Sequence, residues 1–229
     1  MADIGGAHLS VIATAVDLPF FSLYADSKYR TIEALTGQSV GITTAGSSTD
    51  SAARLFLQRF GMLDKVRITP AGNTQAAILA AVMNGAIAAG IFVPPVTEQA
   101  AKAGLVELVN GIKLGIPMNT AGIATTRANV QDRHDMVLRF LRGYQQAWTF
   151  NSDPANEAAV VKVFTKYTQA SEADSRAGYT EMLQVWQSTK VPTMNPEALG
   201  NILKLSDNPQ AKAANPNDFI DSSLLLSFQ

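Results

Sequence analysis

The stretch Ser39–Phe60, with the sequence SVGITTAGSSTDSAARLFLQRF, decides the fold. Val40 and Ile42 alternate with small residues, a pattern that predicts a short strand with one buried face. A loop of small and hydroxyl-bearing residues follows. Apolar residues then recur every three or four positions up to Gly61, which predicts a helix that ends there. The stretch therefore predicts a strand, a tight loop and a helix.

The first turn of this helix is a candidate site for an anion. Its backbone N–H groups have no partner inside the helix, and the peptide dipoles add partial positive charge there. Ser47, Ser48 and Thr49, next to Thr44 and Gly46, add hydroxyl groups, so an oxyanion could be held without a cationic side chain. The same residue types also cap helices that bind nothing. Both interpretations stay open on this stretch alone.

A nucleotide-binding P-loop is excluded by the same loop. Gly41 and Gly46 have its spacing, in the right place between a strand and a helix. That motif requires a lysine followed by serine or threonine, whereas Ser47 and Ser48 stand here. Nucleotide hydrolysis therefore loses its main support.

Composition indicates a globular chain with small or neutral partners. The 229 residues are 47% hydrophobic and 16% charged, with a formal net charge of -1. Because the sequence has no long run of residues with the same charge, it does not indicate electrostatic binding to nucleic acid or anionic lipid. The chain has no cysteine, which excludes disulfides and thiolate chemistry. The apolar run Ala76–Val93 is interrupted by the turn pair Asn84-Gly85, which favours a helix, a turn and a buried strand over a membrane span.

Strands and helices alternate along the first half of the chain. The expected strands are Leu9–Val16, Phe20–Ala25, Val40–Ile42, Val66–Thr69, Ala89–Val93 and Leu105–Val109. From Val130 onward the pattern is helical. Residues 37–113 are expected to form an α/β domain with a mostly parallel sheet. Three loops, Thr43–Thr49, Ala71–Thr74 and Val93–Pro95, follow a strand and precede a helix, so they should meet at one edge of the sheet, where ligands bind.

The order of these motifs resembles that of periplasmic solute-binding proteins of ABC importers, in the sulfonate, taurine, nitrate and thiamine-precursor (NMT1-like) group. The matching segments are Ile32–Gly41 (IEALTGQSVG), Gly46–Asp50 (GSSTD), Gly85–Phe92, Pro94-Pro95 and Asp218–Asp221 (DFID). They extend over residues 6–220.

The resemblance implies an α/β, type II periplasmic-binding-protein-like fold of two lobes. Residues 1–24 and 121–229 would form the first lobe, and residues 25–120 the second, which carries the ligand loop. Two extended crossovers, Phe20–Ala25 and Thr120–Thr126, would let the lobes close on a ligand like a hinge. The implied function is capture of a small organic anion, sulfonate-like or related, for import through an ABC permease. The resemblance also implies a periplasmic location, no catalysis and no cofactor.

Two departures from the group stand out. Ala88 occupies a position where the group usually has an acidic residue. Neither a signal peptide nor the group's first βαβ portion precedes Leu9. We therefore expect a shortened N-terminus and an incomplete first lobe, which could lead the chain to pair with a second copy as a homodimer.

The ligand-binding residues that follow from the loops and the resemblance belong to both lobes. Ser47, Ser48 and Thr49, with Thr44 and Gly46, would hold the anionic head. Asn73 and Thr74 would be polar neighbours, Pro94 and Pro95 would shape the wall, and Phe20 and Asn119 would face the cleft. Phe20 is equally suited to the core, as most aromatic residues are.

Three alternatives remain at this stage. Enzymatic activity is disfavoured because His8 and His134, the only histidines, have neither metal-ligand spacing nor a neighbouring nucleophile motif. A ligand-sensing effector domain of a LysR-like regulator has a similar two-lobed fold, but no winged helix-turn-helix is visible. Binding of a thiamine-precursor pyrimidine is the third alternative.

Overall fold

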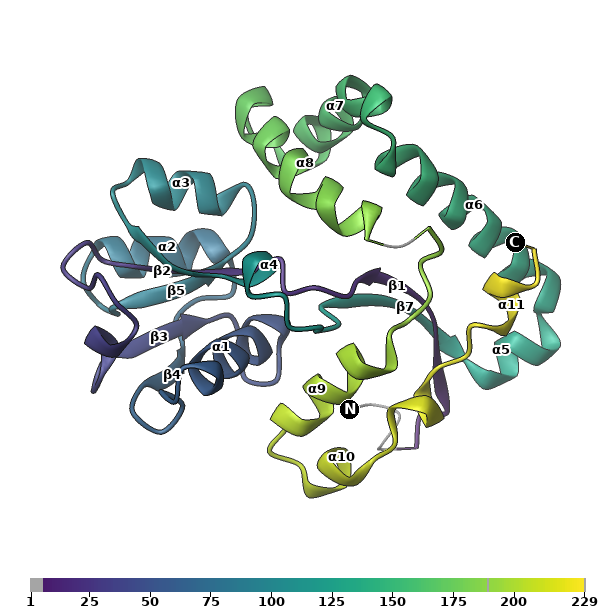
Figure 1. The fold of residues 1–229 in the computed structure, drawn as a ribbon, viewed down its shortest axis with the longest axis horizontal. Helices are drawn as coiled ribbons and strands as arrows, with labels where there is room; N and C mark the ends of the chain where they lie inside the picture. The colour runs from purple at the N-terminus through teal and green to yellow at the C-terminus, as the bar shows by residue number, and fades with distance from the viewer. Residues whose placement is uncertain (1–5, 189, 229) are drawn as a thin grey trace. The chain divides into compact units, whose positions relative to one another are not determined.

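The computed structural model describes residues 6–188 and 190–228, which cluster into two compact units (Figure 1). The division assigns Met1–Leu18, Pro117–Tyr167 and Tyr179–Gln229 to unit 1, and Pro19–Ile116 and Thr168–Gly178 to unit 2. The chain therefore passes from one unit to the other after residues 18 and 116, whereas the sequence-based assignment placed these boundaries after residues 24 and 120. It also passes between the units after residues 167 and 178, so helix α8 (Glu172–Gln187) contributes to both.

Unit 2 is built on a mixed sheet of five strands in the order β4-β3-β5-β2-β6. Their bounds are β2 (Ser22–Ala25), β3 (Ser39–Ile42), β4 (Arg67–Pro70), β5 (Ala89–Phe92) and β6 (Val106–Asn110). Strand β3 is parallel to β4 and β5, while β2 is antiparallel to β5 and β6. The strands expected within residues 37–113 all run in one direction, but β2 lies between β5 and β6 in the opposite direction, so the expected mostly parallel sheet is in fact a mixed one.

The expected crossover Phe20–Ala25 is corrected by this sheet. Its last four residues form β2, the one strand of this sheet that runs against the others, and all four are buried. A continuous buried run indicates a central strand but does not reveal its partners, because pairing with β5 and β6 depends on residues more than 60 positions away.

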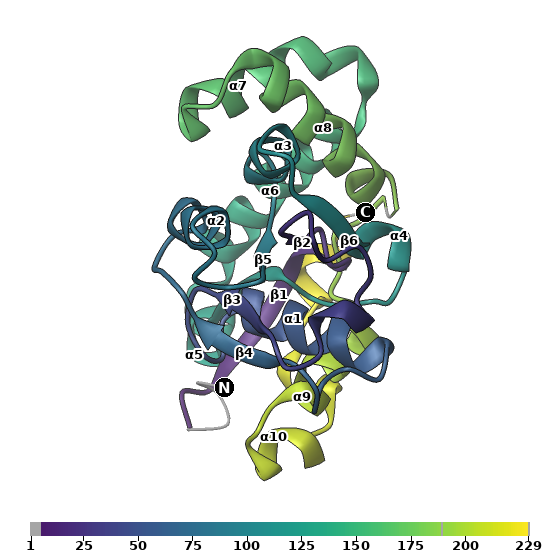
Figure 2. The same ribbon diagram turned by 90° about the vertical axis from the view of Figure 1, so that its left-hand side faces the viewer.

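Helices cover both faces of the unit 2 sheet (Figure 2). They are the 3-10 helix Glu33–Leu35, α1 (Ser48–Arg59), α2 (Gln75–Met83), α3 (Val96–Lys102) and α4 (Gly111–Leu114). Helices α2 and α3 pack on one face, where Ile78, Val82 and Ala100 join Tyr24 and Phe92 in an apolar cluster. Figure 1 shows α1 on the opposite face, and its Phe56 is fully buried.

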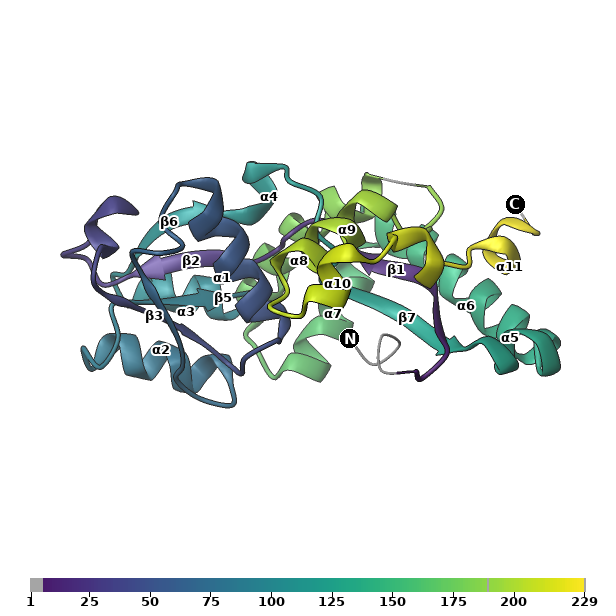
Figure 3. The ribbon, with the colours of Figure 1, turned by 90° about the horizontal axis from the view of Figure 1, so that it is seen from below.

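Unit 1 contains a two-stranded antiparallel sheet, β1 (Leu9–Val16) with β7 (Ala121–Thr126), which lie side by side in Figure 3. The expected crossover Thr120–Thr126 is thus a strand of unit 1, in a register that pairs Leu9 with Thr126. Ile12 and Ala13 of β1 pack with Val137 and Leu141 of helix α6 (His134–Ser152). This packing is the core beneath the sheet.

The remaining helices of the chain complete unit 1. They are α5 (Arg127–Asp132), the 3-10 helix Pro154–Asn156, α7 (Glu157–Thr168), α9 (Pro196–Leu205), α10 (Pro209–Ala213), the 3-10 helix Pro216–Phe219 and α11 (Ser223–Leu226). A second core cluster joins Trp148 of α6, Val160 and Val161 of α7, and Tyr179 and Trp186 of α8. The expected helical second half of the chain is confirmed.

In the part of the chain that the structure describes, no helix combines the length and the apolar character that crossing a bilayer requires.

Candidate functional site

The three loops that were expected to converge lie together in unit 2. Strands β4, β3 and β5 are adjacent and parallel, so the loops after them open on the same edge of the sheet. Two hydrogen bonds connect the loops: the Ala71 amide donates to the Ile42 carbonyl oxygen at 3.0 Å, and the Val93 amide donates to Gln75 Oε1 at 2.9 Å. Gln75 is a residue that sequence reasoning missed, because a glutamine at a helix start carries no distinctive signal.

The loop between β3 and α1 is held by a ring of three hydroxyl groups. The side-chain oxygens of Thr43, Ser47 and Thr49 lie 2.8–3.1 Å from one another. Thr49 Oγ1 also accepts from the Thr43 amide at 3.0 Å, and Ser47 Oγ accepts from the Asp50 amide at 3.3 Å. A cyclic arrangement, in which each hydroxyl donates to the next, satisfies all three donors. The hydroxyls of Ser47 and Thr49 therefore maintain the shape of the loop.

A buried carboxylate holds the other side of this loop. Asp50 is 4% exposed, and its Oδ2 accepts from the Gly46 amide at 2.7 Å. Its Oδ1 lies 2.8 Å from Arg54 Nε, so the negative charge is paired one helical turn away. Gly46 has a φ of +76°, a conformation that favours glycine. The sequence indicated that residues of this loop could cap the helix, but it did not predict the hydrogen bond between Asp50 and Gly46.

The backbone amides of Ser48 and Thr49 take no part as donors in this hydrogen-bond network. Neither donates a hydrogen bond to any acceptor within residues 6–188 and 190–228. The side chains of Ser48 and Thr44 are exposed. Helix α1 is 12 residues long, so its aligned peptide dipoles add partial positive charge at these amides. An anionic group could accept hydrogen bonds from both amides at this end of α1.

The two neighbouring loops supply a polar side and an apolar side. Asn73 and Thr74 are exposed, and Thr74 Oγ1 caps α2 by accepting from the Ala77 amide at 3.2 Å. Pro94 and Pro95 are half-buried and precede α3. Both pairs lie at the same sheet edge as the start of α1. Their contact with a ligand remains a prediction.

Phe20 and Asn119 fall in different units. Phe20 is half-buried in unit 2, where its ring lies 4.9 Å from that of Phe21. Asn119 belongs to unit 1, and its Nδ2 donates to the carbonyl oxygen of Ala121 at 3.0 Å and to Asp17 Oδ1 at 3.3 Å. Asn119 therefore has a defined structural role within its own unit.

Asp17 is the centre of a polar cluster in unit 1. It accepts from Thr14 Oγ1 at 2.6 Å, from Asn119 Nδ2, and from the Asn195 amide at 3.1 Å. Burial raises the pKa of this carboxyl, although the three hydrogen bonds oppose the rise. The cluster therefore connects the end of β1 with Asn119, in the segment before β7, and with Asn195, the residue that caps α9.

We expect Tyr144 to lose its proton only at high pH, and the stability of the fold to decrease when it does. Its hydroxyl donates to the Thr14 carbonyl oxygen at 2.8 Å, and burial, with the nearby Asp17 carboxylate, raises its pKa from 10.0 to about 12. Because the folded pKa is raised, the contribution of the neutral phenol to stability is complete below pH 10 and is lost as the pH rises toward 12. A titration of tyrosinate absorbance should show a smaller late component in Tyr144→Phe, in which Tyr179, whose pKa burial also raises, still titrates late. Loss of a component near pH 10 instead would contradict the assignment.

We expect the ring of three hydroxyl groups to contribute to the stability of the loop. Thr49→Val keeps the shape of a side chain that is 3% exposed but leaves the Thr43 amide without its acceptor. We expect the free energy of unfolding, measured by urea denaturation, to fall by about 1–3 kcal/mol. Thr44→Val, at an exposed position in the same loop, is the control and should change it by less than about 0.5 kcal/mol. Equal effects of the two variants would show that the ring does not support the loop.

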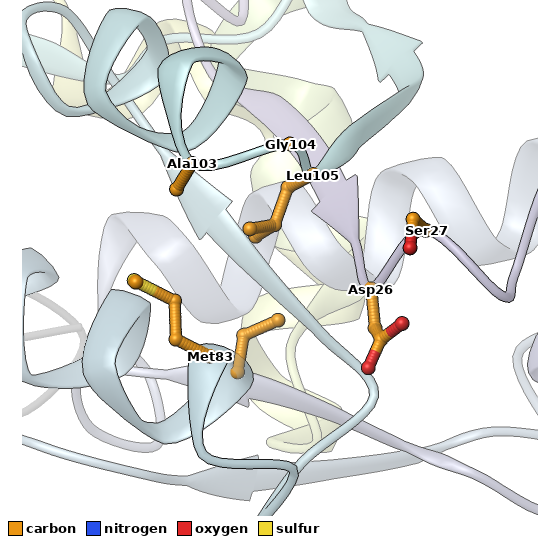
Figure 4. Close-up of a pocket in the computed structure, with 7 residues that line it drawn as sticks. Asp26, Ser27, Met83, Ala103, Gly104 and Leu105 are labelled. Carbon is orange, nitrogen blue, oxygen red and sulfur yellow. The ribbon is translucent and has the colours of Figure 1, made fainter.

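A second hollow in unit 2 is a weaker candidate (Figure 4). Its volume is about 190 Å³, and it is lined by Asp26, Ser27, Val82, Met83, Ala103, Gly104 and Leu105. It lies at the opposite edge of the sheet, where β2 ends and β6 begins. Asp26 already accepts from the Lys28 amide and lies 3.3 Å from Lys28 Nζ, contacts that lower its pKa. The only carboxylate of this hollow is therefore already paired.

Residues 6–188 and 190–228 contain no group of three or more histidine, cysteine, aspartate or glutamate side chains that could hold a metal ion.

Most of the chain is similar to known proteins. A model of the NMT1/THI5-like family matches residues 1–158. Comparison with curated protein sequences finds no match.

Three solved structures illustrate the similarity in fold. The periplasmic sulfonate-binding protein SsuA from Methylobacillus flagellatus KT has a TM-score of 0.72 at 14% identity, with 97% of this chain and 70% of that chain covered. The alkanesulfonate-binding protein SsuA from Xanthomonas axonopodis pv. citri, bound to MOPS, has a TM-score of 0.69 at 16% identity, with 98% and 74% covered. The ligand-binding component of an ABC-type import system from Staphylococcus aureus, with zinc bound, has a TM-score of 0.72 at 16% identity, with 100% and 77% covered. The expected α/β periplasmic-binding-protein fold is confirmed.

Proposed function

Because the chain belongs to the NMT1/THI5-like family, we propose that it is the solute-binding component of an ABC-type import system. It would capture a small organic anion, sulfonate-like or related, and pass it on chemically unchanged. The names of the structures similar in fold support this proposal, since two are sulfonate-binding proteins and one is an import component. A periplasmic location and an ABC permease as partner are parts of the same proposal.

One observation carries the proposal for the ligand: the Ser48 and Thr49 amides at the start of α1 donate to no acceptor in the described ranges. Two donors on one helix terminus suit the oxygens of a sulfonate, a nitrate or a carboxylate. The charge of the bound group would be stabilised by the dipole of α1, so no cationic side chain is required. This arrangement favours a compact anionic head.

The neighbouring loops would recognise the rest of the ligand. The exposed side chains of Ser48, Thr44, Asn73 and Thr74 offer polar contacts, and Pro94 and Pro95 offer an apolar wall. We propose that these residues contact the ligand directly. The hydroxyls of Ser47 and Thr49, with the carboxylate of Asp50, would instead hold the loop so that the two amides stay aligned.

A pyrimidine ligand is the second candidate, and the match to the NMT1/THI5-like family favours it. The dipole of α1 would stabilise an anion but would add little to the binding of a neutral or cationic ring, so this loop should favour only one of the two ligand classes. They can be separated by one screen.

The screen is a thermal-shift measurement with alkanesulfonates, taurine, nitrate, short carboxylates and a thiamine-precursor pyrimidine. A ligand that binds the native state raises the melting temperature by mass action. We expect at least one organic anion to do so, in a saturable way. Stabilisation by the pyrimidine alone would favour the second candidate, and no stabilisation by any compound would contradict the proposed function.

A further inference from the structure

The three loops of the candidate site are joined to one another by two different kinds of contact. The loops before α1 and α2 are joined through the backbone, because β3 and β4 pair in parallel along their whole length and the Ala71 amide then donates to the Ile42 carbonyl oxygen. Strand β5 pairs with β3 only through Ala89 and Gly90, so this pairing ends before β5 reaches the loop Val93–Pro95. The position of that loop relative to the other two is therefore not set by the sheet alone.

The loop Val93–Pro95 has a single amide hydrogen, and Gln75 binds it. Proline has no N–H group, so Pro94 and Pro95 cannot donate a backbone hydrogen bond. The Val93 amide donates to Gln75 Oε1 at 2.9 Å, and the Val93 carbonyl oxygen accepts from two amides in the first turn of α3, at 2.9 and 3.3 Å. Both polar backbone groups of Val93 are thereby fixed, one of them by the side chain of the first residue of α2.

Apolar packing cannot replace this hydrogen bond. Ile78 of α2 and Phe92 of β5 lie in one apolar cluster of unit 2, but such packing has no direction and offers an amide no acceptor. Within residues 6–188 and 190–228, the bond from Val93 to Gln75 is the only hydrogen bond that ties residues 93–95 to residues 43–49 or 71–75. One side chain therefore connects the third loop to the other two.

We propose that Gln75 is a positioning residue that determines which organic groups the ligand site accepts. This inference rests on the proposed function, in which the amides at the start of α1 hold the anionic head and Pro94 and Pro95 contact the rest of the ligand. By fixing Val93, Gln75 sets how closely the two prolines approach the organic group. An uncharged acceptor also suits an anion site, because a carboxylate at position 75 would bind the Val93 amide equally well but would repel the ligand.

The test compares two sulfonates that share a head and differ in the tail, methanesulfonate and pentanesulfonate, by isothermal titration. Gln75→Met keeps the length of the side chain but removes the strong acceptor for the Val93 amide. We expect the affinity for pentanesulfonate to fall at least about fivefold and that for methanesulfonate less than about twofold, because only the longer tail extends to the prolines. Both affinities are measured on one variant, so their ratio does not depend on a loss of folded protein.

Two further variants separate positioning from a general effect. Gln75→Glu restores an oxygen for the Val93 amide, so the ratio of the two affinities should return to that of the unmodified protein even though the added charge weakens both. Gln99→Met makes the same change at an exposed glutamine of α3 and should leave both affinities within about twofold. An unchanged ratio in Gln75→Met, a ratio that Gln99→Met alters equally, or a ratio that Gln75→Glu does not restore would each overturn the inference.

Hydrogen exchange provides a measurement that needs no ligand. The Val93 amide should exchange at least about fivefold faster in Gln75→Met than in the unmodified protein, and at the unmodified rate in Gln75→Glu. Equal exchange in Gln75→Met and the unmodified protein would overturn the inference. Failure of both sulfonates to bind the unmodified protein would overturn it too, and the thermal-shift screen then shows separately whether the proposed function fails as well.

Discussion

Ser48→Glu should reduce affinity for the anionic ligand at least about tenfold, because like charges at contact distance repel by about 1 kcal/mol in water and about 4 kcal/mol near a protein surface. Ser48 is the first residue of α1, where a carboxylate can take up the free amides and satisfy the helix dipole itself. The substitution should therefore weaken binding while the fold is kept. The measurement is an isothermal titration with the anion that gives the largest thermal shift.

Gln58→Glu is the matched control, since it adds the same charge to the same helix at an exposed position. Ten residues of helix separate the two sites by about 15 Å, which exceeds the screening length at physiological salt. Affinity should therefore stay close to that of the unmodified protein. If Ser48→Glu binds as tightly as Gln58→Glu, the start of α1 is not the anion site.

Gly111→Ala should cause a large loss of stability in unit 2. A Cβ atom at this position would lie 2.0 Å from the Pro19 carbonyl oxygen, 2.7 Å from that of Phe21 and 2.9 Å from Phe56 Cζ. Two of these neighbours are backbone atoms next to β2, and the Gly111 amide itself donates to the Phe21 oxygen at 2.9 Å. Relief of the overlap would require the chain before β2 to move. We expect the free energy of unfolding to fall by about 3 kcal/mol or more.

Gly143→Ala provides the comparison in helix α6. A Cβ atom there meets nothing within 4 Å, and the position is exposed. Because alanine is the better helix former, this variant should be stabilised by about 0.5–1 kcal/mol. Urea denaturation of both variants checks the pair. A loss of less than about 1 kcal/mol in Gly111→Ala would contradict the close approach of the chain at this residue.

The sequence predicted the elements of unit 2 well because their signals are local. Alternating or continuous apolar runs located β3, β4, β5 and β6. The convergence of three loops followed from the parallel order of the strands alone. The hydroxyl-rich loop was therefore predicted at the sheet edge where the structure has it.

Long-range contacts were outside the reach of such patterns. Phe20–Ala25 was expected to connect two lobes, yet its partners β5 and β6 make its last four residues a central strand. The carboxylate of Asp17 accepts hydrogen bonds from Asn119 and Asn195, which lie more than 100 residues later in the chain. One local contact was missed as well: Ser47 and Thr49 were expected to offer their hydroxyls to a ligand, whereas both hydroxyls contact that of Thr43, four and six residues earlier.

The most direct test of the account follows the amide groups themselves. Titration of isotope-labelled protein with the best anion from the screen should shift the amide resonances of Ser48 and Thr49 in a saturable way, with smaller changes in the loops before α2 and α3. Saturable binding that leaves both resonances unchanged would contradict the central claim that these two amides hold the ligand.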